Sequence, residues 1–314
     1  MTRVAILDDY QRTASGQADW DSLPAEVVDF FHDHLADVGE LAERLAPYDV
    51  VVAMRERTPF PASLLERLPK LRLLVTTGRR NAAIDVEAAH RQGVAICGTR
   101  ADPRGTPELT WALILALTRR VLDEDRALRE GDWQRSVGTG LAGKTLGVLG
   151  LGRIGTAVAA IGRAFEMRVI AWSPNLTGDR AREAGARLVS RQALFKESDV
   201  LTVHLVLGAT TRGLVGATDL ARMRAGAYLV NTSRGPIVDQ DALLAALNEN
   251  RIAGAGLDVY DVEPLPAGHP LLTAPHTVLT PHLGYVTDTG YGLMFGDAVE
   301  DIAAFLAGTP LRVI

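Results

Sequence analysis

The chain has 314 residues, which is enough for one large domain or two of ordinary size. Hydrophobic residues make up 47% and charged residues 23%, as in a soluble globular protein, and the net charge of −5 argues against a nucleic-acid partner. Cys97 is the only cysteine, which excludes an internal disulfide and favours the cytoplasm, and no apolar run is long enough to span a membrane.

The first hundred residues alternate short aliphatic runs with helical patterns. Strands are expected at residues 4–7, 50–53, 73–75 and 94–96, and helices at 37–46 and 83–92. This alternation predicts βαβ units and a parallel sheet. A stretch rich in proline, glycine and charge, TRADPRGTPE (99–108), then indicates a linker.

The rest of the chain contains a second and better-defined series. A long helix is expected from Glu108 to about Arg129, and a helix from about Gly292 to Gly308 closes the chain. Between them, six strands are expected at residues 145–149, 169–172, 200–203, 227–230, 255–259 and 277–279. Six strands separated by helices predict a complete doubly wound sheet.

A glycine-rich turn of the dinucleotide-binding kind follows the first strand of this second series. The stretch VLGLGRIG (148–155) places glycine at 150, 152 and 155 between a strand and a helix beginning at Arg153. The first glycine permits the tight turn, the second lets the backbone approach a pyrophosphate, and the third lets helix and strand pack closely. The alternative, a glycine turn without a ligand, is weaker because of this strand–helix context.

The next strand ends at Ser173, where dinucleotide sites normally carry an acid that binds the ribose of NAD. A serine removes the repulsion against the 2′-phosphate of NADP. No arginine stands beside it to pair with that phosphate, since Pro174 and Asn175 follow and Arg180 and Arg182 come later. The sequence therefore predicts a nicotinamide cofactor, NAD being slightly favoured over NADP.

Three further strands lead into polar residues: Arg234 in NTSRGP, Glu263 in AGAGLDVYDVEP and His282 in TPHLGY. Parallel sheets bind ligands beyond the carboxyl ends of their strands, so these side chains are expected to converge. Arginine can grip a carboxylate with two hydrogen bonds, and histidine braced by glutamate can exchange a proton with an oxygen. With hydride from a nicotinamide, this set would interconvert a 2-keto acid and a 2-hydroxy acid. Taken singly, each residue is more often a surface charge or an ordinary hydrogen-bonded side chain.

The chain resembles the D-isomer-specific 2-hydroxyacid dehydrogenases. The matching stretches are GKTLGVLGLGRIG (143–155), VNTSRGPIVDQDAL (230–243), AGLDVYDVEPLP (255–266) and TPHLGYVT (280–287), in the family's order and spacing. The resemblance implies that Arg234 binds the substrate carboxylate, His282 donates the proton and Glu263 is its partner. It also implies a set of residues around the cofactor: Gly150, Gly152, Arg153, Ile154, Gly155, Ser173, Val206, Thr211, Thr232 and Asp258.

The family also implies an architecture of two Rossmann-like doubly wound α/β domains. The dinucleotide-binding domain, 100–285, would be inserted into a substrate domain made of 1–99 and 286–314, with the active site in the cleft and homodimers formed through the cofactor domains. In the substrate domain, MRERTPF resembles a stretch of phosphoglycerate dehydrogenases, so Arg55 and Arg57 are candidates for binding an anionic substrate. The alternative for this pair is an exposed charged loop. In TTGRRNAAID, the backbone amides of Gly78 and Arg79 are expected to hold the carboxylate.

Several residues depart from the family's pattern, including Ser173, Val206 in place of a proline, Thr110 where many relatives carry histidine, and Arg79-Arg80. These departures bear on the choice of cofactor and substrate. A relative acting on another small anion stays open, although Glu263 argues against formate dehydrogenases, which carry glutamine there. A nucleotide-sensing corepressor of the same fold is the alternative from a different class. No metal site is expected, since neither His32-x-His34 nor the pair His269 and His276 comes with a cysteine cluster.

Overall fold

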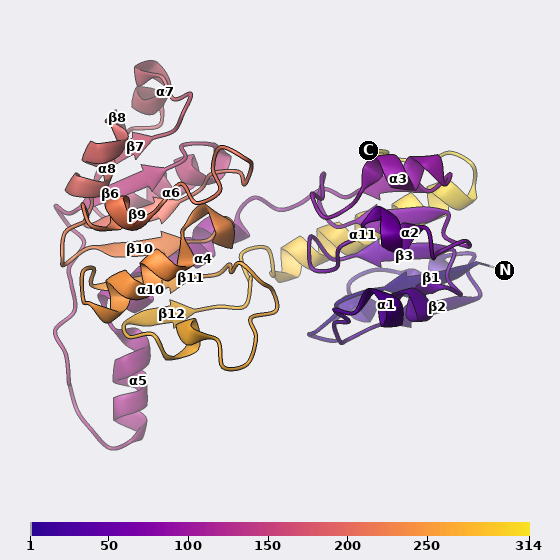
Figure 1. Ribbon diagram of the computed structural model, residues 1–314, viewed down its shortest axis with the longest axis horizontal. Coiled ribbons are helices and arrows are strands. Elements are labelled where there is room, and N and C mark those ends of the chain that lie inside the picture. The colour runs from indigo at the N-terminus through magenta and orange to yellow at the C-terminus, as the bar shows by residue number, and fades with distance from the viewer. Residues whose placement is uncertain (1) are drawn as a thin grey trace. The chain divides into compact units, whose positions relative to one another are not determined.

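The computed structural model describes residues 2–314, and the chain divides into two compact units. Unit 1 comprises the residues up to Asp102 and Tyr285–Ile314, and unit 2 comprises Pro103–Gly284. Each unit is an α/β layer structure around its own parallel sheet (Figure 1). The two sheets have five and seven strands, so the expected α/β class with two Rossmann-like sheets is confirmed.

Unit 1 has the strand order β2-β1-β3-β4-β5, with all pairs parallel. Its strands are β1 (Arg3–Ile6), β2 (Val27–Phe30), β3 (Val50–Ala53), β4 (Leu73–Thr76) and β5 (Ala95–Gly98). Its α-helices are α1 (Val38–Leu45), α2 (Ala62–Leu65), α3 (Val86–Arg91) and α11 (Asp288–Leu306). The chain continues from β1 to β2 on one side of the sheet and from β3 to β4 on the other, so the strand order reverses between β1 and β3. Open parallel sheets bind ligands at such a crevice, beyond the carboxyl ends of the strands. The sequence did not predict the edge strand β2, because its four half-buried residues give little signal for a strand.

Unit 2 has the order β12-β11-β10-β9-β6-β7-β8, again with all pairs parallel. Its strands are β6 (Thr145–Leu149), β7 (Arg168–Trp172), β8 (Arg187–Leu188), β9 (Val200–Val203), β10 (Tyr228–Asn231), β11 (Gly254–Leu257) and β12 (Thr277–Leu279). Its α-helices are α4 (Gly105–Thr118), α5 (Val121–Arg129), α6 (Arg153–Ala164), α7 (Gly178–Glu183), α8 (Arg191–Glu197), α9 (Ala217–Leu220) and α10 (Gln240–Asn248). All six expected strands are present, and the short strand β8 is added at one edge of the sheet. The strand order from β8 to β11 is that of dinucleotide-binding sheets, and β6 and β9 flank its crevice.

The prediction of one continuous helix over 108–129 is wrong, because α4 ends at Thr118 and α5 begins at Val121. Arg120 between them adopts a left-handed backbone with φ of +53°. A later segment packs against this helix end: the Thr139 amide donates to the Thr118 carbonyl, and a Cβ on Gly138 would lie 3.1 Å from the Arg119 Cα. The break is set by this long-range contact, which no local glycine or proline announces.

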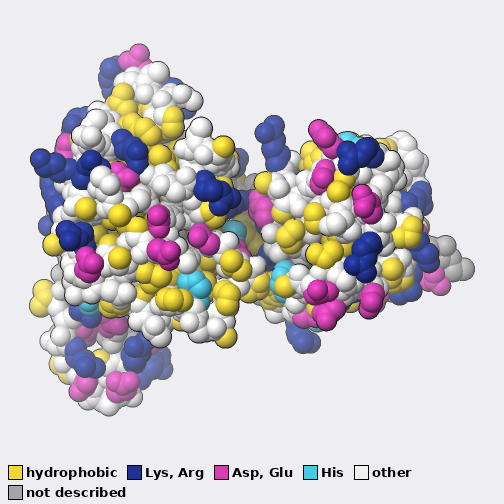
Figure 2. All heavy atoms as spheres, in the orientation of Figure 1, with side chains coloured by type: hydrophobic (Ala, Val, Ile, Leu, Met, Phe, Trp, Pro, Cys, Tyr) yellow, Lys and Arg dark blue, Asp and Glu magenta, His cyan; other side chains and the backbone are white. Residues whose placement is uncertain are grey.

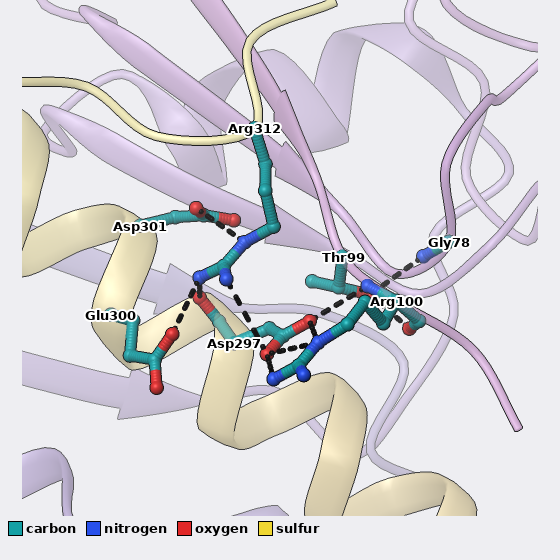
Figure 3. A network of polar contacts seen from close by, with 7 residues as sticks. All are labelled: Gly78, Thr99, Arg100, Asp297, Glu300, Asp301 and Arg312. Carbon is teal, nitrogen blue, oxygen red and sulfur yellow. Dashed lines mark hydrogen bonds and ion pairs between the residues drawn. The ribbon is translucent and has the colours of Figure 1, made fainter.

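An ion-pair network fastens the C-terminal tail to unit 1 (Figure 3). Asp297, on α11 and only 1% exposed, accepts from the Arg100 backbone amide at 2.7 Å and from its guanidinium at 2.6 Å. Arg312, in the tail, donates to Asp301 at 2.9 Å and to Glu300 at 3.0 Å. The tail also bridges the edge of β5, since Cys97 pairs with Val313. The network therefore joins the end of β5, α11 and the tail.

Across residues 2–314, no helix is both long and apolar enough to cross a membrane. On the face that Figure 2 shows, acidic and basic side chains are interspersed over both units.

Candidate active site

The glycine-rich turn of unit 2 leaves room for a ligand at one of its three glycines. A Cβ on Gly150, which has φ of +104°, would lie 2.6 Å from the His204 carbonyl oxygen, and one on Gly155 would lie 2.1 Å from the Gly150 oxygen. These two glycines are needed for close packing between backbone segments. A Cβ on Gly152 would meet nothing within 4 Å, and α6 begins directly after it with its first amides lacking helical acceptors. Open space at a helix N-terminus suits the pyrophosphate of a dinucleotide.

Arg153 and Ile154 form the first turn of α6. The Arg153 side chain is exposed, whereas Ile154 is half-buried and packs against the core beneath the sheet. Their backbone amides belong to the first turn, which lacks acceptors within the helix, and Ile154 packs the helix against the sheet.

Ser173 has a structural task at the end of β7. Its hydroxyl oxygen accepts a hydrogen bond of 2.9 Å from the Leu151 amide, inside the glycine turn. The serine thus links the glycine turn after β6 to the end of the neighbouring strand β7. Its hydroxyl proton can still be donated, for example to a ribose hydroxyl. On α7, Arg182 pairs with Asp179 at 3.0 Å.

Val206 and Thr211 lie in the loop after β9. Val206 is 86% exposed, while Thr211 is buried and its hydroxyl donates to the Val206 carbonyl at 2.7 Å and accepts from the Gly208 amide at 2.8 Å. Thr211 therefore shapes this loop with both hydrogen bonds of its hydroxyl, and Val206 is the apolar side chain that the loop presents.

Glu263 and His282 meet although they come from different loops. His282 Nδ1 lies 2.6 Å from Glu263 Oε2, and the other carboxylate oxygen accepts from the Tyr260 amide at 2.9 Å. Both side chains are partly enclosed, with 17% exposure for the histidine and 26% for the glutamate. Pairing through Nδ1 fixes the ring orientation and directs Nε2 to the opposite side of the ring.

Asp258, at the end of β11, anchors the loop that carries His282. Its fully buried carboxylate accepts from Thr280 Oγ1 at 2.6 Å and from the amides of Leu283 at 2.7 Å and Gly284 at 2.9 Å. Burial raises the pKa of Asp258, while these hydrogen bonds and His282 act in the opposite direction. The structure therefore gives this residue a role that the sequence did not predict, since it was expected only as a residue near the nicotinamide.

The Arg234 loop, after β10, lies directly against the loop of Glu263. A Cβ on Gly235 would lie 2.1 Å from the Tyr260 carbonyl carbon, so only glycine permits this approach. Asn231 Nδ2 donates to the Arg234 carbonyl at 3.0 Å. On the same strand end, Thr232 shares a hydrogen bond of 2.8 Å with Thr110 of α4, a pairing that explains a threonine at 110. Arg234, Glu263 and His282 thus stand on three adjacent loops of unit 2, beyond neighbouring strands.

In unit 1, Arg57 is enclosed. Its Nη1 donates to the Asp8 carbonyl at 2.7 Å, and its guanidinium carbon lies 4.5 Å from the Tyr10 ring centroid. Burial alone would lower the pKa of Arg57, but Tyr285, Tyr291, Tyr10 and Asp8 outweigh it and raise the pKa, so the group stays charged. The alternative of an exposed charged loop is therefore wrong for Arg57.

The loop after β4 differs from the prediction at one of its two amides. The Gly78 amide donates to Thr99 Oγ1 at 2.8 Å (Figure 3), so this donor is engaged within unit 1. The lack of a side chain at Gly78 instead makes room for Arg55, because a Cβ at position 78 would lie 1.9 Å from Arg55 Nη1. The side chains of Arg79 and Arg80 are exposed.

A separate hollow of about 420 Å³ lies at the end of the seven-stranded sheet where β10, β11 and β12 begin, next to α5. None of the expected site residues lines it. The histidines considered for metal binding have other neighbours: His34 Nδ1 lies 3.1 Å from Asp8, and His32 Nδ1 lies 3.0 Å from the Asp9 carbonyl.

Comparison with known proteins bears on the same stretches. The family model described as "D-isomer specific 2-hydroxyacid dehydrogenase, NAD binding domain" matches residues 111–284. The glyoxylate reductase of Aeropyrum pernix is 43% identical over 255 residues, which cover 78% of this chain and 76% of that protein. The D-3-phosphoglycerate dehydrogenase of Archaeoglobus fulgidus is 36% identical over 279 residues, 87% of this chain and 52% of that protein.

Among solved structures, phosphoglycerate oxidoreductase from Vibrio cholerae aligns with a TM-score of 0.93 at 37% identity, covering 98% of this chain and 100% of that one. The family model spans the glycine turn and the loops of Arg234, Glu263 and His282, so the strand order, the turn and the sequence all point to one assignment. The chain belongs to the D-isomer-specific 2-hydroxyacid dehydrogenase family, whose NAD-binding domain it carries.

Proposed function

We propose that this enzyme interconverts a small 2-keto acid and the corresponding 2-hydroxy acid, with Arg234, His282 and Glu263 as its catalytic residues. The observation that carries the proposal is the 2.6 Å contact between Glu263 and His282, on loops next to the loop of Arg234. A nicotinamide bound at the glycine turn supplies or accepts the hydride. Arg234 binds the substrate carboxylate and polarises the adjacent carbonyl, and protonated His282 donates its Nε2 proton to the carbonyl oxygen. Glu263 stabilises the charged imidazole and holds its orientation.

We infer that the pyrophosphate is held by the amides of the first turn of α6, around Arg153 and Ile154, and that Gly152 lets it approach. Thr232, Asp258 and Val206 are proposed to surround the nicotinamide half. NAD is the preferred cofactor in this proposal, because Pro174 and Asn175 rather than an arginine follow Ser173, and Arg182 on α7 is paired with Asp179. An acid is nevertheless missing at Ser173, so some activity with NADP is expected.

Arg55 and Arg57 are proposed to bind an acidic group at the far end of the substrate, and the Arg79 amide to contact the substrate carboxylate. The support is positional: both arginines follow the carboxyl end of β3, at the crevice of the five-stranded sheet, and Arg57 is charged and enclosed. This favours a keto acid with a second acidic group over the two-carbon substrate implied by the name of the Aeropyrum relative.

The proposal also includes a homodimer in the cytoplasm, formed through unit 2. Helix α5 has one buried residue, Ala127, and the segment from α5 onward exposes a set of large apolar side chains: Val121, Leu122, Leu128, Trp133 and Val137. Such a surface is typical of an interface. Sedimentation analysis of the wild type and of Trp133→Ser tests it, and a monomeric wild type at micromolar concentration would reject the dimer.

The reaction is tested by following the absorbance of NADH and NADPH separately against a panel of 2-keto acids. Turnover with NADH is expected. Tight cofactor binding with no turnover of any acid would instead favour a nucleotide-sensing protein, the second candidate.

A further inference from the structure

Arg57 in unit 1 is held by aromatic rings. Its guanidinium carbon lies 4.5 Å from the Tyr10 centroid and 5.6 Å from the Tyr285 centroid, within the range of cation–π attraction. Tyr291 of α11 adds to the electrostatic stabilisation of the same cation. These tyrosines come from the loop after β1, from the segment just before α11 and from α11 itself. Two distant parts of the chain, the N-terminal segment of Tyr10 and the C-terminal segment of Tyr285 and Tyr291, therefore converge on one guanidinium.

Arg55 shares one of these rings. Its guanidinium carbon lies 5.7 Å from the Tyr285 centroid, and its Nη1 donates to the Thr77 carbonyl at 3.2 Å. The backbone of Arg55 is left-handed, with φ of +53°, and its side chain lies over Gly78. An acid is also close, since Glu56 Oε2 lies 3.8 Å from Arg55 Nε. Among residues 2–314, Tyr285 is the one ring within cation–π distance of both arginines.

Tyr285 also occupies a particular place in the chain. It is the first residue of the second segment of unit 1, and it follows His282 by three residues. Its ring is half-buried and packs against the core cluster of unit 1 that contains Tyr291 and Phe295. The ring is thus anchored in the fold that carries Arg55 and Arg57, while its backbone continues from the loop of the proposed proton donor.

A ring holds a guanidinium differently from a carboxylate. A carboxylate neutralises the cation and occupies its N–H donors, whereas an aromatic face attracts the cation and leaves the donors in the plane of the guanidinium available. Two arginines on one ring therefore keep their charge and a fixed separation. This is the arrangement needed to recognise the oxygens of a second carboxylate or of a phosphate.

We propose that Tyr285 is a positioning residue that sets substrate specificity, because it holds Arg55 and Arg57 as one recognition unit for the far acidic group of the substrate. The inference rests on the proposed function of the two arginines. Tyr10 supports the Arg57 side of the unit alone.

The test compares two kinds of substrate. Glyoxylate has no far group, whereas oxaloacetate and 3-phosphohydroxypyruvate carry a second acid, so the ratio of their KM values reports on recognition of that acid. Where a diacid is not turned over, its inhibition constant against glyoxylate replaces its KM. The variants are Tyr285→Leu, Tyr285→Phe, Tyr10→Leu and Arg57→Gln, with Tyr285→Leu also made in the Arg57→Gln background.

Tyr48→Leu is the matched control. The Arg3 guanidinium lies 5.1 Å from the Tyr48 centroid, and Tyr48 is buried, so this variant also removes an arginine–tyrosine contact from unit 1. Tyr48 precedes β3, at the opposite end of the strand from Arg55. It therefore controls for a general loss of stability.

Tyr285→Leu is expected to raise the KM for the diacids by about 3- to 30-fold, with the KM for glyoxylate and kcat nearly unchanged. Tyr285→Phe retains the ring and should restore the wild-type ratio. Tyr285→Leu should add less in the Arg57→Gln background than in the wild type. Tyr10→Leu, at an exposed residue, should shift the ratio in the same direction, and it serves as the test if Tyr285→Leu does not fold.

The outcomes separate the two hypotheses. If Arg57→Gln leaves the ratio unchanged, the proposed role of the arginines is wrong. If Arg57→Gln changes the ratio but neither Tyr285→Leu nor Tyr10→Leu does, or if Tyr285→Leu raises both KM values equally, the role of Tyr285 is wrong.

Discussion

Each of the two sheets carries proposed site residues at its own carboxyl edge, but the two units hold these residues by different means. In unit 2, the loops of Glu263 and His282 are fixed by short hydrogen bonds to carboxylates, 2.6 Å at His282 and 2.6–2.9 Å around Asp258. In unit 1, the guanidinium of Arg57 lies against rings at 4.5 and 5.6 Å and donates a hydrogen bond of 2.7 Å to a backbone carbonyl rather than to a carboxylate.

This difference follows from the tasks proposed for the two sets. Proton transfer requires a donor within hydrogen-bond reach of one atom, so a small displacement costs much of the rate. Recognition of an anion by a delocalised cation tolerates more variation in angle and distance. The comparison suggests a general difference between the two kinds of loop. A loop that positions a proton donor is held by directional hydrogen bonds, whereas a loop that positions a cation for anion binding can be held by contacts with aromatic rings.

The largest expected effect is on the proposed proton donor of unit 2. His282→Ala should lower kcat by about 10²- to 10⁴-fold, because general acid catalysis contributes on that order. The dissociation constant of NADH, measured by fluorescence, should stay close to that of the wild type. His90→Ala, at an exposed histidine of α3, is the matched control and should retain full activity. A His282→Ala enzyme with wild-type kcat would remove the proposed role.

Buried carboxylates of the two units give the next largest contrast. Asp258→Asn replaces an acceptor of three hydrogen bonds, and the asparagine amide would face a backbone donor. We expect kcat to fall at least tenfold and unit 2 to lose about 2–4 kcal/mol of unfolding free energy.

Asp297→Asn is the counterpart in unit 1, where the carboxylate pairs with Arg100 (Figure 3). It should lower stability by about 1–3 kcal/mol while kcat stays within about twofold, because the Arg100 side chain is 57% exposed and the pair touches no proposed site residue directly. Thermal unfolding and steady-state kinetics of both variants measure the contrast. Equal losses of kcat would contradict the division of labour between the units.

The cofactor preference gives a smaller effect. Ser173→Asp keeps an acceptor for the Leu151 amide and adds a charge near the position of the 2′ substituent. Binding of NADPH should weaken by about 10-fold or more through repulsion, while NADH binds as well as before or better. Unchanged NADPH affinity, measured by fluorescence titration, would show that the 2′ substituent lies elsewhere.

Much of the fold could be predicted because its signals are local. The strands around the glycine turn are short aliphatic runs between helical patterns, and their alternation dictates a parallel sheet. The strand-end residues Arg234, Glu263 and His282 could be grouped for the same reason, since parallel strands share one carboxyl edge.

The features that were missed depend on contacts distant in sequence. The end of α4 at Thr118 is fixed by residues 138 and 139, and nothing near Thr118 announces it. The engagement of the Gly78 amide by Thr99 also depends on residues 21 positions apart. Asp258 directly follows the strand β11, and the loop of residues 283 and 284 follows the neighbouring strand β12. Because these two strand ends are adjacent, Asp258 could have been suspected as an anchor for that loop.

The smallest expected effect is the pH dependence of unit 1 through Asp301. Burial raises the pKa of Asp301 from 3.8 to about 6, with Arg312 opposing and Asp297 and Glu300 adding to the shift. The folded state therefore binds the proton more tightly than the unfolded chain. This carboxyl stabilises the fold fully below about pH 4, and that contribution is lost as the pH rises to about 6.

Asp301→Asn keeps an acceptor for Arg312 Nε and cannot titrate. The unfolding free energy of this variant minus that of the wild type should increase between about pH 4 and pH 6, by on the order of 1 kcal/mol. Denaturant unfolding at several pH values measures this difference. A difference that is flat for Asp301→Asn would mean that Arg312 already keeps the carboxylate ionised, so the tail would be held by an ordinary ion pair at every pH in this range.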